Sequence, residues 1–243
     1  MKTSLSLRAA LLSLSLGFSL GLSGAASASD QTVQVEVTNL TNGTYFTPLL
    51  IAAHAPNVHL FQLGTPASTS LQAMAEGGDL SGLIADLDDA GATYVENPAG
   101  GALAPDSTAT ASLQVDRPAR RLSITAMLVP TNDGFVGLNG MPIPVRPGVY
   151  TVYLNGYDAG TEANDEVITG GGAPGEPGIP GDPGGNSGTG GTGLAGPDNN
   201  PMVHIHRGVI GDLDPTGGPS DLDATIHRWL NPVAKVVITV GRP

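Results

Sequence analysis

The chain contains no cysteine. That absence excludes disulfide bonds, thiol nucleophiles and zinc sites with cysteine ligands, so the fold must be held by a hydrophobic core, by bound metal, or by both. Aromatic residues make up 4% of the sequence, and Trp229 is the one tryptophan that could form a sugar-binding platform. Basic residues are also scarce: the sequence has 10 Lys and Arg against 22 Asp and Glu.

The resulting formal charge of −12 limits the partners. A polyanion of this size repels nucleic acid and anionic lipid and attracts cations. We therefore expect no nucleic-acid partner. The sequence also shows no basic patch and no exposed apolar loop that would favour membrane binding. Much of the acidity is equally well explained as a means of keeping an exported protein in solution.

Residues 1–28 have the pattern of a secretory signal peptide. Lys2 and Arg8 flank the start of an apolar run, and an A-x-A cleavage site ends at Ala28. A membrane anchor is the alternative, but the run is short for a span of ~20 residues. We expect a mature chain of residues 29–243, secreted, periplasmic or at the cell surface, without a transmembrane segment. Cleavage removes Lys2 and Arg8 but no Asp or Glu, so the formal charge changes from −12 for the full chain to −14 for the mature chain.

Short segments with strand-like patterns dominate the mature chain. Apolar and polar residues alternate in 31–40 and in 121–129, and 48–55 is a continuous apolar run typical of a strand buried on both faces. Further strands are predicted around 149–154 and 235–240. Many short strands separated by Gly and Pro turns favour an all-β antiparallel sandwich.

Two short helices and one segment of unusual composition interrupt the strands. The helices are predicted near residues 68–78 and 80–89. Residues 170–200 are mostly Gly and Pro, with too few Gly-X-Y triplets for a collagen helix. We expect this segment to be a disordered insertion in a single domain of residues 29–243, because it cannot bury enough surface to order itself.

The segment "GYDAGTEANDE", residues 156–166, holds four acidic side chains. A solvated loop, a catalytic carboxylate pair and a calcium site are all open interpretations. Asp133 and Asp158 each follow a predicted strand, so they could meet at one sheet edge, with Glu162 folded back beside them. Calcium takes six to eight such oxygen ligands. The spacing is not that of an EF-hand, and spacing alone favours a solvated loop. Nothing indicates the cleft that a glycosidase needs.

The histidines allow a transition-metal interpretation. His204 and His206 alternate in "MVHIHRG" and would share one face of a strand, where His227 or His54 could complete a zinc or copper site. Solvated or hydrogen-bonded histidines on an edge strand are the simpler interpretation. A second acidic cluster in residues 212–223 is interpreted as a solvated loop. No motif of a zinc protease, a serine hydrolase or a phosphate-binding loop is present.

Four segments occur in a familiar order: "FQLGTPASTSLQAMAEGG", "AMLVPTNDGFVGLNG", "YDAGTEAND" and "NPVAKVVITV". The most specific are P-x-x-D-x-x-V-G, from Pro130 to Gly137, and DAGT, from Asp158 to Thr161. In this order they resemble the spondin domain found in F-spondin, in mindin and in many exported bacterial proteins. The resemblance covers nearly all of residues 31–241 except the Gly/Pro segment.

The resemblance implies an eight-stranded antiparallel β-sandwich similar to a C2 domain, with a role in matrix adhesion. It also implies a calcium ion at the sandwich edge, with Asp133, Asp158 and Glu162 as ligands. The chain departs from the pattern at three points. Gly134 stands where animal members usually have Trp, Glu162 replaces a second Asp, and the family's cysteines are missing.

We therefore expect an exported, non-enzymatic calcium-binding module that acts at the cell surface or in the extracellular matrix. A surface protein or an anionic polysaccharide is the expected partner. A metal-independent protein-binding module and a purely structural exported domain are the alternatives, and a carboxylate hydrolase is a further one.

Overall fold

The computed structural model describes residues 31–116, 119–185, 187–194 and 200–241. The predicted signal peptide, with its cleavage site at Ala28, lies outside these residues. Within those ranges, none of the helices has the length and apolar content needed to cross a membrane.

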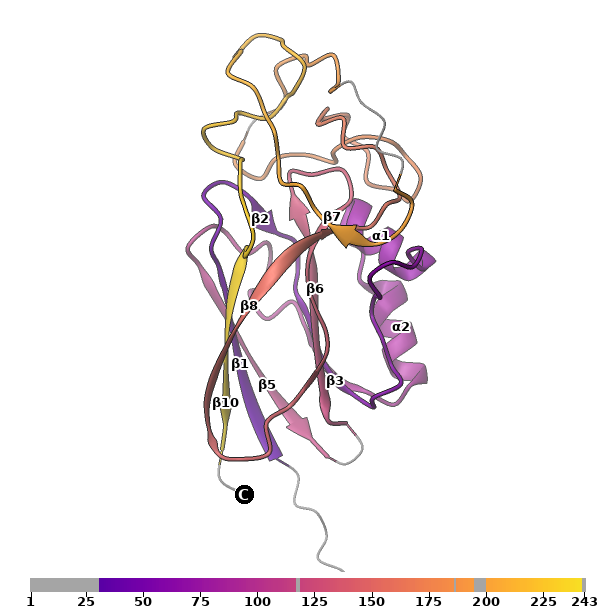
Figure 1. Cartoon of the computed structure of the whole chain (residues 1–243), viewed down its shortest axis with the longest axis vertical. Coiled ribbons are helices and arrows are strands. Elements are labelled where there is room, and N and C mark those ends of the chain that lie inside the picture. Colours follow the sequence, from indigo (N-terminus) through magenta and orange to yellow (C-terminus); the bar gives the residue numbers. More distant parts are fainter. Residues whose placement is uncertain (1–30, 117–118, 186, 195–199, 242–243) are drawn as a thin grey trace, which may run out of the picture.

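Eight strands form one continuous antiparallel sheet in the order β4-β3-β6-β7-β8-β10-β1-β5 (Figure 1). They are β1 (Gln31–Asn39), β3 (Leu50–His54), β4 (Thr93–Glu96), β5 (Thr108–Val115), β6 (Arg121–Val129), β7 (Gly134–Pro142), β8 (Gly148–Asp158) and β10 (Ala234–Val240). Two short strands, β2 (Tyr45–Phe46) and β9 (His204–Ile205), pair with β6 and β8. The sheet curls until β4 and β5, its two ends, contact each other. A mostly antiparallel β fold is confirmed, whereas the likeness to a C2 domain stays a prediction.

The long strand β8 joins the two halves of the sheet. Its residues 148–154 pair with β10, and its residues 155–158 pair with the beginning of β7. The strand therefore leaves one half of the sheet and enters the other. This change of partner brings the end of β8, at Asp158, beside the beginning of β7.

The main core lies inside the curled sheet. It is built from the apolar residues that alternate along β1, β6 and β10, as the sequence pattern predicts. The fully buried members from these strands are Val33, Val35, Val37, Leu122, Ile124, Ala126, Leu128, Ala234, Val236 and Ile238. The outward residues of β1 and β10 are partly or fully exposed.

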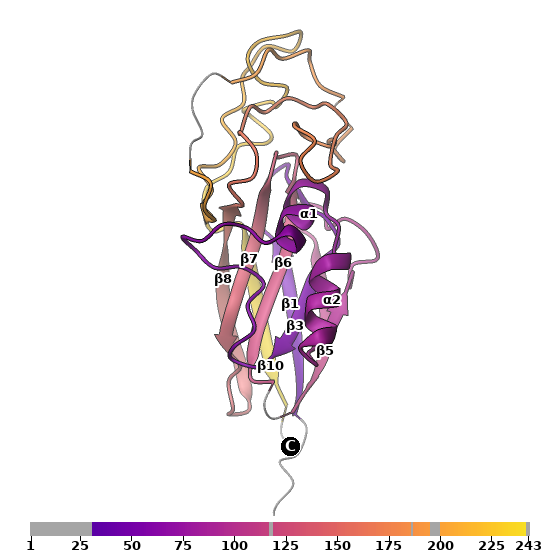
Figure 2. The same cartoon turned by 90° about the vertical axis from the view of Figure 1, so that its right-hand side faces the viewer.

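A second core lies under the two predicted helices, α1 (Thr69–Gly77) and α2 (Ser81–Asp89). They cover the outer face of β3, β6 and β7 (Figure 2). Helix α1 begins after Ser68, whose side chain accepts a hydrogen bond from the N–H of Leu71, and it ends at Gly78 with a left-handed φ of 72°. Because both faces of β6 are covered, every residue from Leu122 to Val129 is buried.

The sequence did not predict strand β7, and its glycines explain why. Gly134, Gly137 and Gly140 interrupt the alternation that indicates a strand, and glycine has low strand propensity. Gly137 has a packing role, because a Cβ there would lie 2.7 Å from the ring of Phe61 and 3.0 Å from that of Tyr157. The rings of Phe61 and Tyr157 are centred 5.0 Å apart.

The Gly/Pro segment, predicted to be a disordered insertion, contacts the folded domain in its described part. In its described part, Ile179 is fully buried and forms a bridge with Ile168. The N–H of Gly175 donates a 2.6 Å hydrogen bond to the buried carboxylate of Glu76 in α1. A carboxylate from the folded domain thus accepts a hydrogen bond from a glycine N–H that lies outside any helix or strand. The segment packs over the end of the sheet that carries Asp158 (Figure 1).

Candidate metal centre

Asp133 and Asp158 lie together at this end of the sheet. Gly134, the residue after Asp133, is the register partner of Asp158, and the N–H of Ala159 donates to the carbonyl of Asp133 at 3.2 Å. The side chains are buried, with 0% and 2% of each residue exposed. The two predicted ligands therefore do meet at one edge. They meet through β7 and β8, however, and not through neighbouring strands at 121–129 and 149–154, because β7 separates these.

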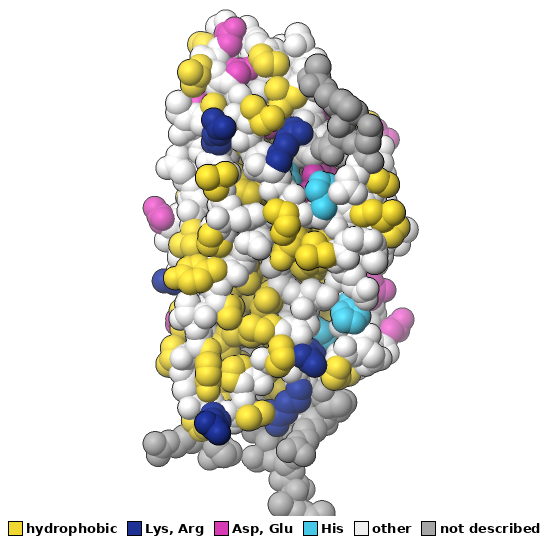
Figure 3. Space-filling view, in the orientation of Figure 1, with side chains coloured by type: hydrophobic (Ala, Val, Ile, Leu, Met, Phe, Trp, Pro, Cys, Tyr) yellow, Lys and Arg dark blue, Asp and Glu magenta, His cyan; other side chains and the backbone are white. Residues whose placement is uncertain are grey.

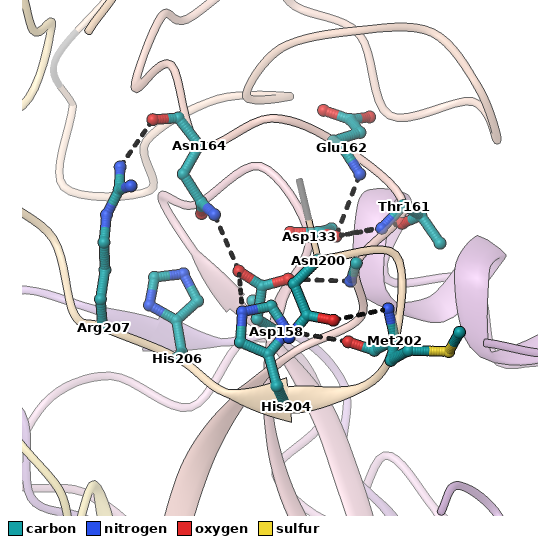
Figure 4. A network of polar contacts seen from close by, with 12 residues as sticks. Asp133, Asp158, Thr161, Glu162, Asn164, Asn200, Met202, His204, His206 and Arg207 are labelled. Carbon is teal, nitrogen blue, oxygen red and sulfur yellow. Dashed lines mark hydrogen bonds and ion pairs between the residues drawn. The ribbon is translucent and has the colours of Figure 1, made fainter. Parts of the chain in front are cut away.

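The acidic turn closes over Asp133 (Figure 4). Oδ2 of Asp133 accepts hydrogen bonds from the N–H of Thr161 at 2.7 Å, from its hydroxyl at 3.2 Å and from the N–H of Glu162 at 3.1 Å. Oδ1 of the same carboxylate is buried and has no hydrogen-bond partner among the residues that the structure describes. One half of this carboxylate is thus fully satisfied and the other half is not.

Asp158 organises the turn that follows it. Its Oδ1 accepts from the N–H of Gly160 at 2.8 Å, and its Oδ2 accepts from the amide of Asn164 at 2.7 Å. Gly160 adopts a left-handed φ of 71°, which favours glycine. Nε2 of His204, in β9, lies 3.7 Å from Oδ2 of Asp158.

Glu162 contributes its backbone to the site but directs its carboxylate elsewhere. Oε2 accepts from the N–H of Gly178 at 3.0 Å and from the amide of Asn132 at 3.4 Å, and Oε1 is buried with no partner within the described ranges. Figure 4 shows this carboxylate pointing away from Asp133 and Asp158. Across the described part of the chain, no group of three or more His, Asp or Glu side chains is arranged to hold a metal ion. The structure therefore brings two predicted ligands together and leaves the third turned away.

The two carboxylates with orphaned oxygens also have perturbed proton affinity. Burial, followed by the negative charge of Asp158, raises the pKa of Asp133 to about 7. Burial also raises the pKa of Glu162 to about 7, with smaller contributions from Glu76 and Asp133. No Lys or Arg forms an ion pair with Asp133 in the residues described. The site therefore favours either a proton or a cation.

Two asparagines, Asn132 and Asn164, support the site. Asn132 is buried, and it donates to Asp165 at 2.9 Å and accepts from the N–H of Glu166 at 3.2 Å. Asn164 is buried beside Asp158. Each asparagine directly precedes an Asp in the sequence. This position beside an acidic residue is the one sequence feature that could have indicated their role in the site.

Gly134 occupies a position with no room for a larger side chain. A Cβ there would lie 2.6 Å from the hydroxyl of Thr131 and 3.1 Å from the ring of His206. That hydroxyl accepts from the N–H of Gly134 at 3.0 Å and donates to the carbonyl of Leu128 at 2.6 Å. A Trp at this position would require a different turn.

The histidines considered for zinc or copper have separate partners. The ring of His206 packs against that of Trp229, with the ring centres 5.0 Å apart and the planes tilted by 40°. His227 lies 3.4 Å from Asp182. His54 is buried in β3 and hydrogen-bonded to Ser123 at 2.7 Å. The described residues therefore do not assemble the predicted alternative site around His204.

The prediction of a solvated loop at 212–223 is wrong for Asp221, of which 2% is exposed. Its Oδ1 accepts from the N–H groups of Thr189, Gly190 and Gly191 at 2.8–2.9 Å, and its Oδ2 accepts from the N–H of Ile168 at 2.7 Å. Burial acts to raise the pKa of Asp221, but these hydrogen bonds outweigh it and hold the pKa below its usual value. Asp221 is a buried anchor for the Gly/Pro segment.

The model of the Spondin_N family matches residues 37–167. This match spans more than half of the chain and includes Asp133, Asp158 and Glu162. The chain belongs to the Spondin_N family. No curated protein matches it. Family membership indicates an extracellular domain. Residues 168–241 lie outside the matched segment, so the Gly/Pro segment and β10 come from the part of the chain that the family model does not cover.

Proposed function

We propose that this Spondin_N domain is an exported, non-enzymatic binding module that holds one calcium ion at Asp133 and Asp158. The observation that supports this most strongly is Oδ1 of Asp133, a buried carboxylate oxygen with no hydrogen-bond partner among the described residues. A second buried carboxylate lies beside it. Two enclosed negative charges repel each other strongly unless a cation or a proton neutralises one of them.

The available ligands fit a hard cation. They are carboxylate, amide and backbone oxygens, which calcium binds in a flexible shell of six to eight, whereas magnesium demands a nearly ideal octahedron. Asp133 and Asp158 would be the central ligands. Glu162 would be the third, because its Oε1 is also buried without a partner in the described structure. It can join after rotation about its side-chain bonds.

Bound calcium would supply charge neutralisation and a link between two loops. Asp133 belongs to the turn between β6 and β7, and Asp158 opens the acidic turn after β8. Fixing one against the other orders the loop surface at this end of the sheet, where a surface protein or an anionic polysaccharide could bind. The enclosure of both carboxylates supports a binding role over hydrolysis, because a catalytic pair must reach its substrate. A cavity of about 460 Å³ nearby is lined by other residues, including Asp182 and His227.

Thermal unfolding of residues 29–243 tests the calcium site. The protein is melted in EDTA and then in rising calcium, with magnesium as the control ion. Saturation at 100-fold over the dissociation constant should add about 2.7 kcal/mol, or roughly 5–10 °C for a domain of this size. The shift should disappear in Asp133→Asn and in Asp158→Asn.

The matched control is Asp106→Asn. Asp106 is exposed, and its φ of 58° is one that Asn also accepts. This variant should keep the full calcium shift. An equal shift with magnesium, or a shift that survives Asp158→Asn, would contradict the proposed site. Binding of a surface protein or an anionic polysaccharide is then compared with and without chelator. A metal-independent binding module would bind its partner equally well in both conditions.

A further inference from the structure

The charge of the domain is unevenly distributed along the sheet. The loops between β8 and β10, residues 159–233, contain nine described acidic residues against Arg207 and Arg228. At the opposite end lie the β5–β6 and β7–β8 turns. Figure 3 shows dark-blue Lys and Arg side chains at the lower end of this face and also in its upper part, and magenta Asp and Glu side chains at the top and along the edges.

Three arginines from distant parts of the sequence form this basic end: Arg120, Arg121 and Arg146. The N–H of Ile143 donates to the carbonyl of Arg120 at 3.0 Å, which ties the β5–β6 turn to the β7–β8 turn, and Arg121 is the register partner of Pro142. None of the three forms an ion pair in the part of the chain that the structure describes.

Within the two turns, the described acid is Asp116, an exposed residue just after β5. Asp88 and Asp89, at the end of α2, border this end of the sheet, and Asp88 accepts from the hydroxyl of Tyr94 in β4 at 3.0 Å. Arg120 donates instead to the neutral side chain of Gln31, at 3.2 Å. The described charges of the two turns themselves are therefore net positive.

An apolar tip accompanies the arginines. Val145 stands between Pro144 and Arg146 in the β7–β8 turn and is 68% exposed. The turn is held in place, because the hydroxyl of Tyr150 donates to the carbonyl of Arg146 at 2.9 Å and Ile143 is buried at its base. Val149, on β8 just beyond the turn, is also 68% exposed. Apolar side chains next to arginines that have no acidic partner are typical of a surface that enters a lipid headgroup layer.

We infer that the basic end docks on an anionic lipid bilayer. The arginines contact lipid phosphates, and Val145 enters the boundary between headgroups and acyl chains. An anionic polysaccharide has no apolar phase to receive Val145, so the exposed valine favours lipid.

The negative charge of the acidic end does not prevent docking. Strand β8 has 11 residues and spans about 36 Å at ~3.3 Å per residue. This is several Debye lengths of roughly 8–10 Å. The acidic loops are therefore screened from a membrane at the other end.

Vesicle sedimentation tests this inference on residues 29–243 in EDTA, so that it is independent of calcium. Vesicles of phosphatidylcholine alone are compared with vesicles that also contain phosphatidylglycerol, at low and at physiological salt. Binding is expected to need phosphatidylglycerol and to weaken with salt. Arg146→Glu should weaken it by at least about fivefold, the effect of one basic residue near an anionic surface, and Val145→Asp should weaken it further.

A matched pair at the acidic end is the control. Arg228 is exposed and Leu230 is 82% exposed, so Arg228→Glu with Leu230→Asp makes the same chemical changes there. This variant should bind vesicles as the wild type does. Thermal melts should show that all variants remain folded.

Three results would overturn the inference. The first is wild-type binding that is absent or independent of phosphatidylglycerol. The second is an equal loss of binding in both variant pairs. The third is binding to dextran sulfate that Val145→Asp leaves unchanged while vesicle binding is absent, because that result assigns the surface to a polysaccharide.

Discussion

The carboxylate of Glu162 accepts a hydrogen bond from the N–H of Gly178 at 3.0 Å, while the backbone N–H of Glu162 donates to Asp133 at 3.1 Å. One residue thus connects the candidate metal centre to the Gly/Pro segment. The resemblance to spondin domains places an Asp here, which is shorter by one methylene. The longer side chain of Glu162 reaches a segment that lies outside the family match.

In the proposed site, calcium and Gly178 would compete for the same carboxylate. We predict that calcium increases amide hydrogen exchange at residues 175–180, because Glu162 turns toward the ion and releases the N–H of Gly178. Hydrogen exchange followed by mass spectrometry measures this. Glu162→Asp should raise exchange there without calcium, and Glu176→Asp, at an exposed neighbouring position, should not. Unchanged exchange on saturation with calcium would show that Glu162 is not a ligand.

The stability of the metal-free protein should depend on pH through Asp133. Folding raises the pKa of this carboxyl to about 7, so the native state holds the proton more tightly than the unfolded state does. Its contribution to stability is complete below the ordinary carboxyl pKa and is lost as pH rises through about 7. Urea unfolding in EDTA should therefore show wild type losing stability relative to Asp133→Asn between about pH 5 and about pH 8. A constant difference would contradict the shifted pKa.

Asp221 should be a structural residue and not a metal ligand. Asp221→Asn places an amide donor against backbone N–H groups and removes charge-assisted hydrogen bonds, so we expect a loss of roughly 2–3 kcal/mol and faster hydrogen exchange at residues 187–194. The calcium shift should persist. Asp214→Asn is the control, because Asp214 is exposed and, among the described residues, its carboxylate accepts only from Thr216. Equal urea midpoints for both variants would contradict the anchoring role.

Gly137 should resist substitution for a packing reason. The added methyl group of Gly137→Ala meets the ring of Phe61 at 2.7 Å, so we expect a loss of about 1–3 kcal/mol. Gly101→Ala is the matched control, since a Cβ at Gly101 has nothing within 4 Å. Thermal unfolding compares the two. A Gly137→Ala variant as stable as Gly101→Ala would mean that the aromatic cluster shifts without cost.

The sequence predicted the elements in which side-chain periodicity is plain. Alternation in β1 and the cap signals of α1 correspond directly to the buried face and the helix ends of the structure. Alternation in β6 indicated the strand but not that both of its faces are buried. Strand β7 was missed because its glycines hide the alternation. Glycine there is required by the rings around Gly137, and such a contact depends on residues distant in sequence.

The candidate site was predicted as residues but not as an arrangement. The spacing in "YDAGTEAND" and the position of Asp133 indicated which carboxylates matter. The sequence could not indicate that Glu162 turns toward Gly178, because that contact depends on how a glycine-rich segment packs over the sheet. The same limit applies to the basic end, where Arg120 and Arg146 become neighbours only when two turns are hydrogen-bonded together.

Crystal structures of residues 29–243 grown with calcium, and with terbium in its place, would locate the ion. We predict an anomalous peak between Asp133 and Asp158, with the carboxylate of Glu162 turned toward it and released from Gly178. A peak confined to other acidic residues, or none at saturating ion, would contradict the calcium site and leave the acidic turn as a buried hydrogen-bonded loop.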